Sequence, residues 1–364
     1  MMATQTDLPS DHKAKIADGS DLRVLMVSNF LSVNGTSRGA CEELADRLIR
    51  SGCQVITTST RTSRIPRLLD MTSTAWRRRN DYDVAQVDVY SGSAFVWAEA
   101  VCFVLRRLKL PYVLALHGGG LPDFALRRSQ RVKRLLSTAS IVTTPSEYLR
   151  DAMSLYRKDL KLIPNSLDLD NYDFQLRVNP QPNLIWLRSL HRMYNPVLAV
   201  QVLARVKQQF PNATLTMVGP DKGEGSLNDV KLEMANLGIS DSVELRGVID
   251  KEDVPRTLNE GDVFLNTTNV DNTPISVIEA MACGLCIVST DVGGIPHLLT
   301  HERDALLVPP RNVQAMADAV CRFLSDHGFA ESLSRNARQD AEQFDWSNTL
   351  PAWQTALRDA RSQR

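Results

Sequence analysis

Two acidic residues, Asp271 and Glu279, stand eight positions apart in the segment NVDNTPISVIEAMACGLCIVSTDVGGIP, residues 269–296. Pro274 suits the first turn of a helix, and Thr273 or Asn272 is expected to cap that helix. Asp271 would then precede the helix, and Glu279 would lie about two turns further on. A helix N-terminus binds anions, and carboxylates beside it accept hydrogen bonds from hydroxyl groups. The segment therefore predicts a pocket for a phosphorylated sugar.

The same segment continues into a strand and a glycine turn. Gly284 is expected to end the helix, and the apolar run 285–288 is typical of a parallel strand buried on both faces. Gly293 and Gly294 follow, where a ligand could approach the backbone closely. Helix, strand and turn together predict a binding site at the carboxyl edge of a sheet.

Two further candidates lie in the first half of the chain. His117, followed by Gly118 and Gly119, ends an expected fourth strand, YVLALH, where open α/β sheets bind ligands. A lone histidine at a strand end is more often structural than functional. Gly35 lies in the polar loop after the first strand, where a plain tight turn is an equal explanation. No G-x-G-x-x-G follows that strand, so a dinucleotide fingerprint is absent.

These candidates need two sheets to position them. Apolar runs alternate with helical segments from 22–28 to 160–163 and again from 184–187 to 305–308. Such alternation predicts doubly wound parallel sheets. We expect a flexible tail over residues 1–20, a first domain over 21–171, a linker over 172–183 and a second domain over 184–345. A final helix is expected over 346–364.

The chain resembles the family 4 retaining glycosyltransferases, which have the GT-B fold. EAMACG at 279–284 and GGIP at 293–296 match the family motifs, and Asp271 replaces the first of two glutamates. IPNSLD at 163–168 resembles the family's hinge motif, with Ser166 in place of glycine. The resemblance implies two Rossmann-like domains facing a cleft, with a C-terminal helix that crosses back to the first domain.

The resemblance also implies roles for single residues. Glu279 would bind the ribose hydroxyls of a nucleotide-sugar donor, and Asp271 would hold the hydroxyls of the transferred sugar. The catalytic candidates are accordingly His117, near the reacting carbon, and Asp271. The donor-binding candidates implied by the family are Gly35, which would approach the donor phosphates, Glu279, and the backbone at Asn272, Thr273, Pro274 and Ile275.

WLRSLHRMYNP at 186–196 departs from the family, which has an arginine and a lysine that neutralise the donor diphosphate. Aligned on Leu190, this chain has Ser189 and Tyr194 at those two positions. Arg188 is the first candidate to supply the missing charge, and Arg192 is the second. Tyr194 could donate its hydroxyl to a phosphate oxygen. The alternative is that both arginines lie on the surface and the chain has lost its binding site for the donor diphosphate.

Composition and charge limit the classes of protein to which the chain can belong. The chain has 364 residues, 43% apolar and 23% charged, which suits two globular domains. It has no apolar run of about 20 residues, so no transmembrane span is expected, and no secretion signal is expected either. Residues 1–170 carry 24 Lys/Arg against 18 Asp/Glu, and the excess concentrates between Arg61 and Arg134. Solvated helix faces explain this excess most simply. A surface for anionic lipid or a lipid diphosphate is the sharper explanation, and nucleic acid is disfavoured.

Cysteine and histidine patterns do not predict another chemistry. Six scattered cysteines suggest reduced thiols in the cytosol, and Cys283 and Cys286 run from a helix end into a strand, which disfavours a redox motif. His297 and His301 are four apart and are expected on one helix face. They lack a third ligand, so a zinc site is not expected.

The resemblance thus implies a retaining glycosyltransferase that uses a nucleotide-sugar donor and needs no metal or other cofactor. The acceptor would be a saccharide or lipid-linked hydroxyl in cell-surface polysaccharide or glycolipid synthesis. The location would be cytoplasmic, with peripheral contact at an anionic inner membrane face. A non-catalytic GT-B subunit that binds nucleotide or a partner is the main alternative. A second alternative is a GT-B sugar-nucleotide epimerase or a GT-B phosphorylase.

Overall fold

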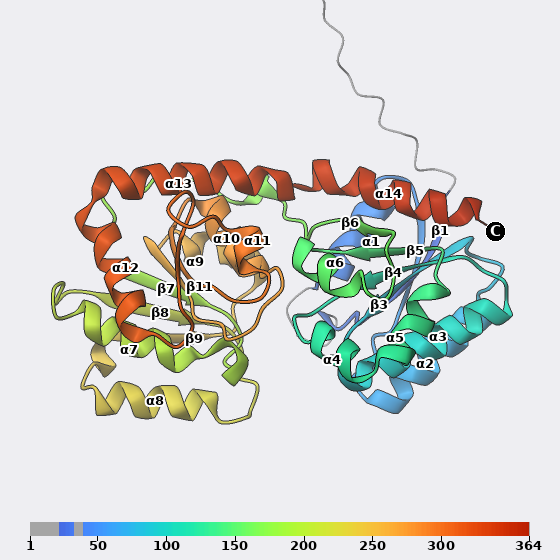
Figure 1. Ribbon diagram of the computed structural model, residues 1–364, viewed down its shortest axis with the longest axis horizontal. Coiled ribbons are helices and arrows are strands. Elements are labelled where there is room, and N and C mark those ends of the chain that lie inside the picture. The colour runs from blue at the N-terminus through green and yellow to red at the C-terminus, as the bar shows by residue number, and fades with distance from the viewer. Residues whose placement is uncertain (1–21, 33–38, 364) are drawn as a thin grey trace, which may run out of the picture.

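The computed structural model describes residues 22–32 and 39–363. It contains two parallel six-stranded sheets, each in its own domain, and the domains lie side by side (Figure 1). Apolar strand residues are buried on both faces of each sheet, because helices cover both sides.

The first domain is built on the strand order β2-β1-β3-β4-β5-β6. The strands are β1 (Arg23–Val27), β2 (Gln54–Thr58), β3 (Val84–Val89), β4 (Tyr112–Leu116), β5 (Ile141–Thr144) and β6 (Leu160–Leu162). One face packs against α2 (Arg64–Arg77), α3 (Phe95–Arg107), α4 (Leu121–Arg127), α5 (Ser129–Ser137) and α6 (Glu147–Met153). The other face packs against α1 (Ala40–Arg50) and the last helix, α14 (Trp346–Ser362).

The second domain has the strand order β12-β11-β10-β7-β8-β9. The strands are β7 (Asn183–Leu187), β8 (Thr214–Val218), β9 (Val243–Gly247), β10 (Val263–Asn266), β11 (Cys286–Thr290) and β12 (Leu306–Val308). The helices α7 (Pro196–Val206), α8 (Ser226–Asn236) and α12 (Val313–Ser325) cover one face. The other face carries α9 (Val254–Leu258), α10 (Ile275–Cys283), α11 (Ile295–Leu298) and α13 (His327–Ala341).

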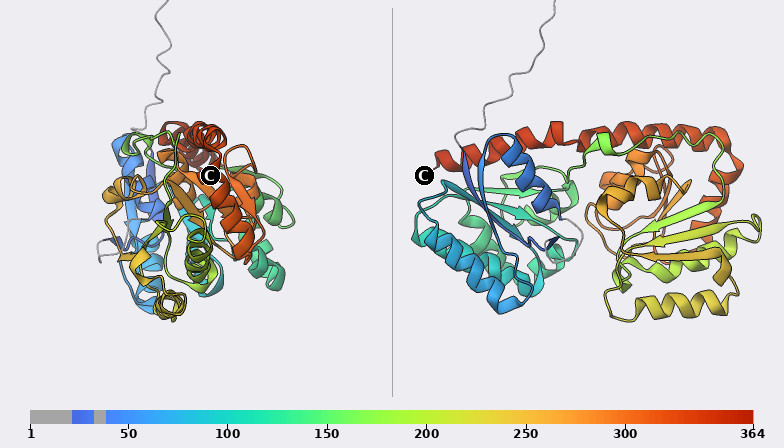
Figure 2. Two further views of the ribbon diagram at one scale, coloured as in Figure 1. Left: turned by 90° about the vertical axis from the view of Figure 1, so that its left-hand side faces the viewer. Right: turned by 180° about the vertical axis from the view of Figure 1, so that it is seen from behind.

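The chain crosses back to the first domain after α13. Figure 2 shows α13 and α14 running along the same side of both domains. Asp345 begins α14 by accepting a hydrogen bond from the Ser347 N–H at 2.8 Å. Trp353, Ala356 and Leu357 then pack on the first sheet together with β1 and β4 residues. The first domain therefore includes a helix from the opposite end of the sequence.

Each sheet has one point where the strand order reverses, and open α/β sheets bind ligands outside the carboxyl ends of strands at such points. In the second sheet the reversal lies between β7 and β10, which pair in parallel. Arg188 directly follows β7, and the loop that contains Asp271 follows β10. The topology thus confirms the predicted fold class and brings the two main candidate segments to one place.

Candidate functional site

The N-terminal turn of α10 is surrounded by buried polar side chains. The predicted cap is wrong: no side chain caps α10, and Pro274 stands just before its first residue, Ile275. The Asn272 amide oxygen accepts a hydrogen bond from Ser146 of the first domain instead. Within the described part of the chain, the Thr273 and Ser276 hydroxyls are buried without a partner. Free backbone N–H groups of the first helical turn add to these two hydroxyls, so the turn can bind an anion.

A guanidinium group lies beside this turn. Arg188 forms an ion pair with Asp271, and its guanidinium lies 4.4 Å from the centre of the Tyr194 ring. Arg188 Nε is buried and bonds no atom of the described residues. The structure therefore brings the candidates Arg188, Asp271 and Tyr194 together. The Nε–H group of the guanidinium remains free to donate a hydrogen bond to a ligand. Tyr194 meets Arg188 through its ring face.

Two glycines fix the backbone of the Asp271 loop. A Cβ on Gly293 would lie 2.2 Å from the Asp271 carbonyl oxygen, and one on Gly294 would lie 1.9 Å from that of Asn272. No real Cβ tolerates such distances, so only glycine fits at either position. The Gly294 N–H also donates to the Asp271 carbonyl at 3.0 Å. The glycine turn therefore serves as a close support for this loop.

Glu279 is nearly fully buried and holds two donors on one carboxylate oxygen. Its Oε1 accepts a hydrogen bond from the Tyr172 hydroxyl at 2.8 Å and forms an ion pair with Lys251. Burial alone would lower the pKa of Lys251, but the Glu279 charge outweighs it and raises that pKa. Burial, followed by the Glu279 charge, raises the pKa of Tyr172. Glu279 is thus held in a fixed orientation by Tyr172 and Lys251.

His117 is held by a buried carboxylate, Asp88 in β3. The two side chains approach to 3.0 Å between His117 Nε2 and Asp88 Oδ1, and Tyr90 stacks on the imidazole with ring centres 5.1 Å apart. Asp88 also accepts hydrogen bonds from Ser28 and Gln86. Burial alone would raise the pKa of Asp88, but His117 and these hydrogen bonds lower it. Asp88 therefore keeps a negative charge and orients the His117 ring.

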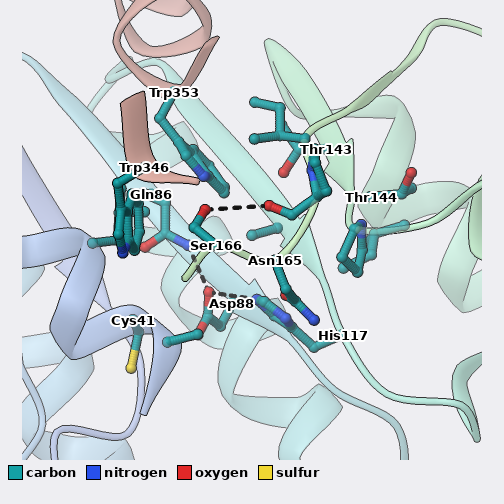
Figure 3. A pocket seen from close by; sticks show the side chains of 17 residues that line it. Cys41, Gln86, Asp88, His117, Thr143, Thr144, Asn165, Ser166, Trp346 and Trp353 are labelled. Atoms are coloured by element: carbon teal, nitrogen blue, oxygen red, sulfur yellow. Dashed lines mark hydrogen bonds and ion pairs between the residues drawn. The ribbon is translucent and has the colours of Figure 1, made fainter. Parts of the chain in front are cut away.

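A small cavity of about 30 Å³ adjoins His117 and Asp88, between the sheet and the first turns of α1 and α14 (Figure 3). Trp346 and Trp353 close it on one side, and the Gln86 Oε1 atom is buried there without a partner in the described structure. The volume suits one or two water molecules. A sugar ring would need more room than this cavity offers.

The two domains touch through the Asp271 loop. Asn165 donates its side-chain N–H to the Thr273 carbonyl at 2.9 Å, besides the Ser146–Asn272 hydrogen bond. A Cβ on Gly119 would lie 3.2 Å from the Asp271 carbonyl carbon, so this glycine packs against the Asp271 loop. The carboxyl ends of both sheets therefore meet around residues 271–273.

Other predicted residues lie apart from this group. The Arg192 side chain is 71% exposed, and its Nε lies 3.5 Å from Glu224 rather than near Asp271. Gly35 lies outside the described residues. The expectation for His301 is wrong, because α11 ends at Leu298 and His301 accepts a hydrogen bond from the Leu307 N–H. In the described residues no group of three or more His, Cys, Asp or Glu side chains could hold a metal ion.

Sequence reasoning missed Lys251, Tyr172, Ser276 and Asp88. Ser276 carried a usable signal, since a small hydroxyl residue two positions after a helix-starting proline faces the helix N-terminus. Asp88, an acid inside an apolar strand run, was a second signal, because buried carboxylates need partners. No sequence signal marked Lys251 or Tyr172, because their partner Glu279 is 28 and 107 positions away, respectively.

We expect Lys251→Met to destabilise the protein by about 3 kcal/mol, because it leaves the buried Glu279 charge without its cation. The loss should shrink when Glu279→Gln is added, since the neutral amide needs no counter-charge. Urea unfolding of both single variants and the double variant measures this coupling. Arg256→Met, in an exposed ion pair with Asp253, is the control and should change little. Equal losses in the single and double Lys251 variants would contradict the expected coupling.

Comparison with known proteins concerns mainly the second domain. Residues 170–340, just under half of the chain, match the family model described as glycosyl transferases group 1. Through this segment the chain is similar to that family. The match contains Arg188, Lys251, Asp271 and Glu279, and so most of the candidate site.

The curated relatives of this chain are distant. A D-inositol 3-phosphate glycosyltransferase of Jonesia denitrificans is 26% identical over 170 residues, which are 46% of this chain and 40% of that protein. The amylovoran biosynthesis glycosyltransferase AmsK of Erwinia amylovora is 31% identical over 132 residues, 35% of this chain and 32% of the relative. The chain thus matches less than half the length of either relative.

Solved structures resemble the chain over nearly its full length. The Anabaena protein HepE, solved with UDP and glucose, gives a TM-score of 0.73 at 18% identity, covering 93% of this chain and 99% of that one. Sucrose-phosphate synthase of Thermosynechococcus elongatus gives 0.76 at 18% identity, covering 94% and 100%. At such identity the likeness concerns the fold, and it agrees with the GT-B architecture. In the described structure no helix has the length and apolar character needed to cross a membrane.

Proposed function

We propose that this protein transfers a sugar from a nucleoside diphosphate donor to an acceptor hydroxyl. The observation that supports this most is the set of unused donors at one helix start: the Thr273 and Ser276 hydroxyls and Arg188 Nε. Buried polar groups normally have partners, and a diphosphate supplies oxygen acceptors for all three. The helix dipole of α10 and the arginine charge add to the attraction.

In this proposal each carboxylate binds hydroxyl groups of the donor. Glu279, fixed by Lys251 and Tyr172, accepts hydrogen bonds from the ribose, and Asp271 accepts them from the transferred sugar. The backbone from Asn272 to Ile275 lines the sugar and phosphate positions. Arg188 then exchanges part of its contact with Asp271 for the β-phosphate, on which charge develops as the donor bond breaks.

We further propose that the reaction retains the anomeric configuration. The bond from the anomeric carbon to the phosphate oxygen breaks, and the acceptor oxygen bonds to the same face of that carbon. The acceptor proton passes to the leaving diphosphate oxygen, so no protein nucleophile and no metal is needed. His117, held by Asp88, contacts the sugar from the first domain. The contacts between the domains around residues 271–273 exclude water that would hydrolyse the donor.

The proposed acceptor is a saccharide or a lipid-linked saccharide used in cell-surface polysaccharide or glycolipid synthesis, at the cytoplasmic face of a membrane. Two facts support this choice. The first 170 residues carry a net excess of basic residues, and one relative is named for the biosynthesis of the polysaccharide amylovoran.

Thermal unfolding with a panel of nucleoside diphosphates and their sugars, without metal, tests the donor site. One base should raise the melting temperature, since a ligand at about 100 times its Kd stabilises by about 2.7 kcal/mol. Glu279→Ala should abolish both this shift and the release of free sugar from the matching donor. A nucleotide shift without turnover on any acceptor or water would favour the non-catalytic subunit. No shift with any nucleotide would contradict the proposed donor site.

A further inference from the structure

Helix α2 exposes a row of large apolar side chains to solvent. Ile65 is 73% exposed, Leu69 63% and Trp76 51%. Their spacing of four and seven residues places them on one side of the helix. Single exposed apolar residues are ordinary, but a contiguous row on one helix indicates an interaction surface.

Helix α3 packs beside α2 and extends this row into a surface. Val96 is 44% exposed and Phe103 50%, and they stand seven residues apart on α3. A groove of about 700 Å³ runs along α2, lined by Leu69, Trp76 and Val104 among others. Figure 1 shows α2 and α3 side by side, on the side of the first domain away from α14. We call this surface, formed by the exposed sides of α2 and α3, the α2–α3 face.

Arginines surround these apolar side chains. The exposed ones are Arg61, Arg64, Arg77, Arg78, Arg79, Arg106 and Arg107. Of these seven, Arg78 pairs with Asp81, and no carboxylate of the described residues pairs with the other six. One carboxylate, Asp70, also lines the groove and accepts a hydrogen bond from Thr58. The α2–α3 face is therefore apolar and carries a net positive charge.

Two of the arginines lie directly on exposed aromatic rings. The Arg79 guanidinium lies 5.6 Å from the centre of the Trp76 ring, and Arg107 lies 5.0 Å from the centre of the Phe103 ring. An arginine stacked on an aromatic ring matches the boundary between lipid headgroups and hydrocarbon, where the ring meets acyl chains and the cation meets phosphate.

Charge complementarity decides between occupants of this face. A second copy of the chain bound through the same face would bring six unpaired arginines against six others, which is unfavourable. An anionic bilayer supplies a negative surface for the arginines and hydrocarbon for Ile65, Leu69 and Trp76. An anionic bilayer therefore satisfies both the arginines and the apolar side chains of the α2–α3 face.

We propose that the α2–α3 face docks this protein on anionic lipid bilayers, with Leu69 and Trp76 inserted and the arginines on the headgroup phosphates. The inference deepens the membrane location proposed above. Docking on this face is separate from the donor site, whose residues follow β7 and β10 of the other domain. Vesicle binding and nucleotide binding can therefore fail independently.

Sedimentation of the full chain with vesicles tests this docking. Vesicles of phosphatidylglycerol and phosphatidylcholine in equal parts should bind the protein, and vesicles of phosphatidylcholine alone should bind it far less. Arg77→Gln with Arg107→Gln should weaken binding by roughly fivefold for each arginine removed. Leu69→Ser with Trp76→Ser should weaken it at least tenfold, because both side chains would lose their contact with hydrocarbon.

Helix α8 of the second domain supplies matched controls. Leu232 is 62% exposed, and the neighbouring Lys231 is exposed too. The double variant Lys231→Gln/Leu232→Ser removes one charge and one apolar side chain of similar exposure, and it should bind vesicles as the wild type does. All variants should keep the wild-type melting temperature and nucleotide shift, since only exposed positions change.

Trp76 fluorescence separates insertion from simple charge attraction. Anionic vesicles should shift the emission to shorter wavelength, and Trp76→Phe should bind the vesicles but lose that shift. The inference is overturned if the wild type ignores anionic vesicles at low salt. It is equally overturned if the α8 control weakens binding as much as the α2–α3 variants, or if Trp76→Phe keeps the full spectral shift.

Discussion

Arg188→Ala is expected to lower kcat for sugar transfer by about a hundredfold to a thousandfold, the usual cost of removing one fixed donor to developing charge. Arg188 brings a positive charge to the start of α10 and keeps its Nε unbonded within the described structure. The variant would lose that charge when the diphosphate departs. The KM for the donor should rise less than kcat falls, because the contact strengthens as the donor bond breaks.

Arg192→Ala provides the matched control, since it removes the same side chain four residues away. Arg192 is mostly exposed and lies near Glu224. Its loss should change kcat by less than threefold, as expected for a surface position. Steady-state kinetics of both variants with one donor settles which arginine acts. Equal losses, or a larger loss in Arg192→Ala, would contradict the placement of the phosphate site beside Asp271.

Gly294→Ala should abolish the donor-induced thermal shift and lower transfer at least a hundredfold. Its new Cβ would lie 1.9 Å from the Asn272 carbonyl oxygen, so the 271–273 loop must move. A displacement of about 1 Å in a positioning loop can cost a hundredfold in rate. Thermal unfolding with the donor and a transfer assay measure the two effects.

Gly328→Ala is the steric control for this variant. Gly328 lies in the first turn of α13, where a new Cβ would find its nearest neighbour 4.0 Å away. The substitution should keep activity and gain a few tenths of a kcal/mol in stability, because alanine favours helix. Gly294→Ala with normal donor binding would show that the loop tolerates movement and does not position the donor.

The fold could be predicted because its signals are local. The run LRVLMVS at 22–28 and the later apolar runs became strands, and Ser146 caps α6 with its side chain, as serine before a helix commonly does. Gly284 ends α10 with a positive φ of 76°, a conformation that glycine adopts readily. These features depend on neighbours within a few residues, so one sequence is sufficient to find them.

The details of the candidate site depend on contacts that sequence cannot supply. Arg188 and Arg192 have the same chemistry, and only the end of β7 at Leu187 decides which one meets Asp271. Asn272 suits a helix cap locally, yet Ser146, 126 positions away, takes its side-chain oxygen. Long-range partners outcompeted local preference at these points, and that competition is settled by tertiary packing.

The return of α14 to the first sheet has a consequence for the order of assembly during synthesis. Helix α1 covers part of the apolar sheet face early, but the part under α14, which includes Val113 and Ala115, stays uncovered until Trp353 and Leu357 leave the ribosome. The second domain is one continuous stretch from β7 to α13 and can close its cores earlier. The domain synthesised first is therefore completed last, and its open sheet face is the part of the nascent protein most in need of protection from aggregation.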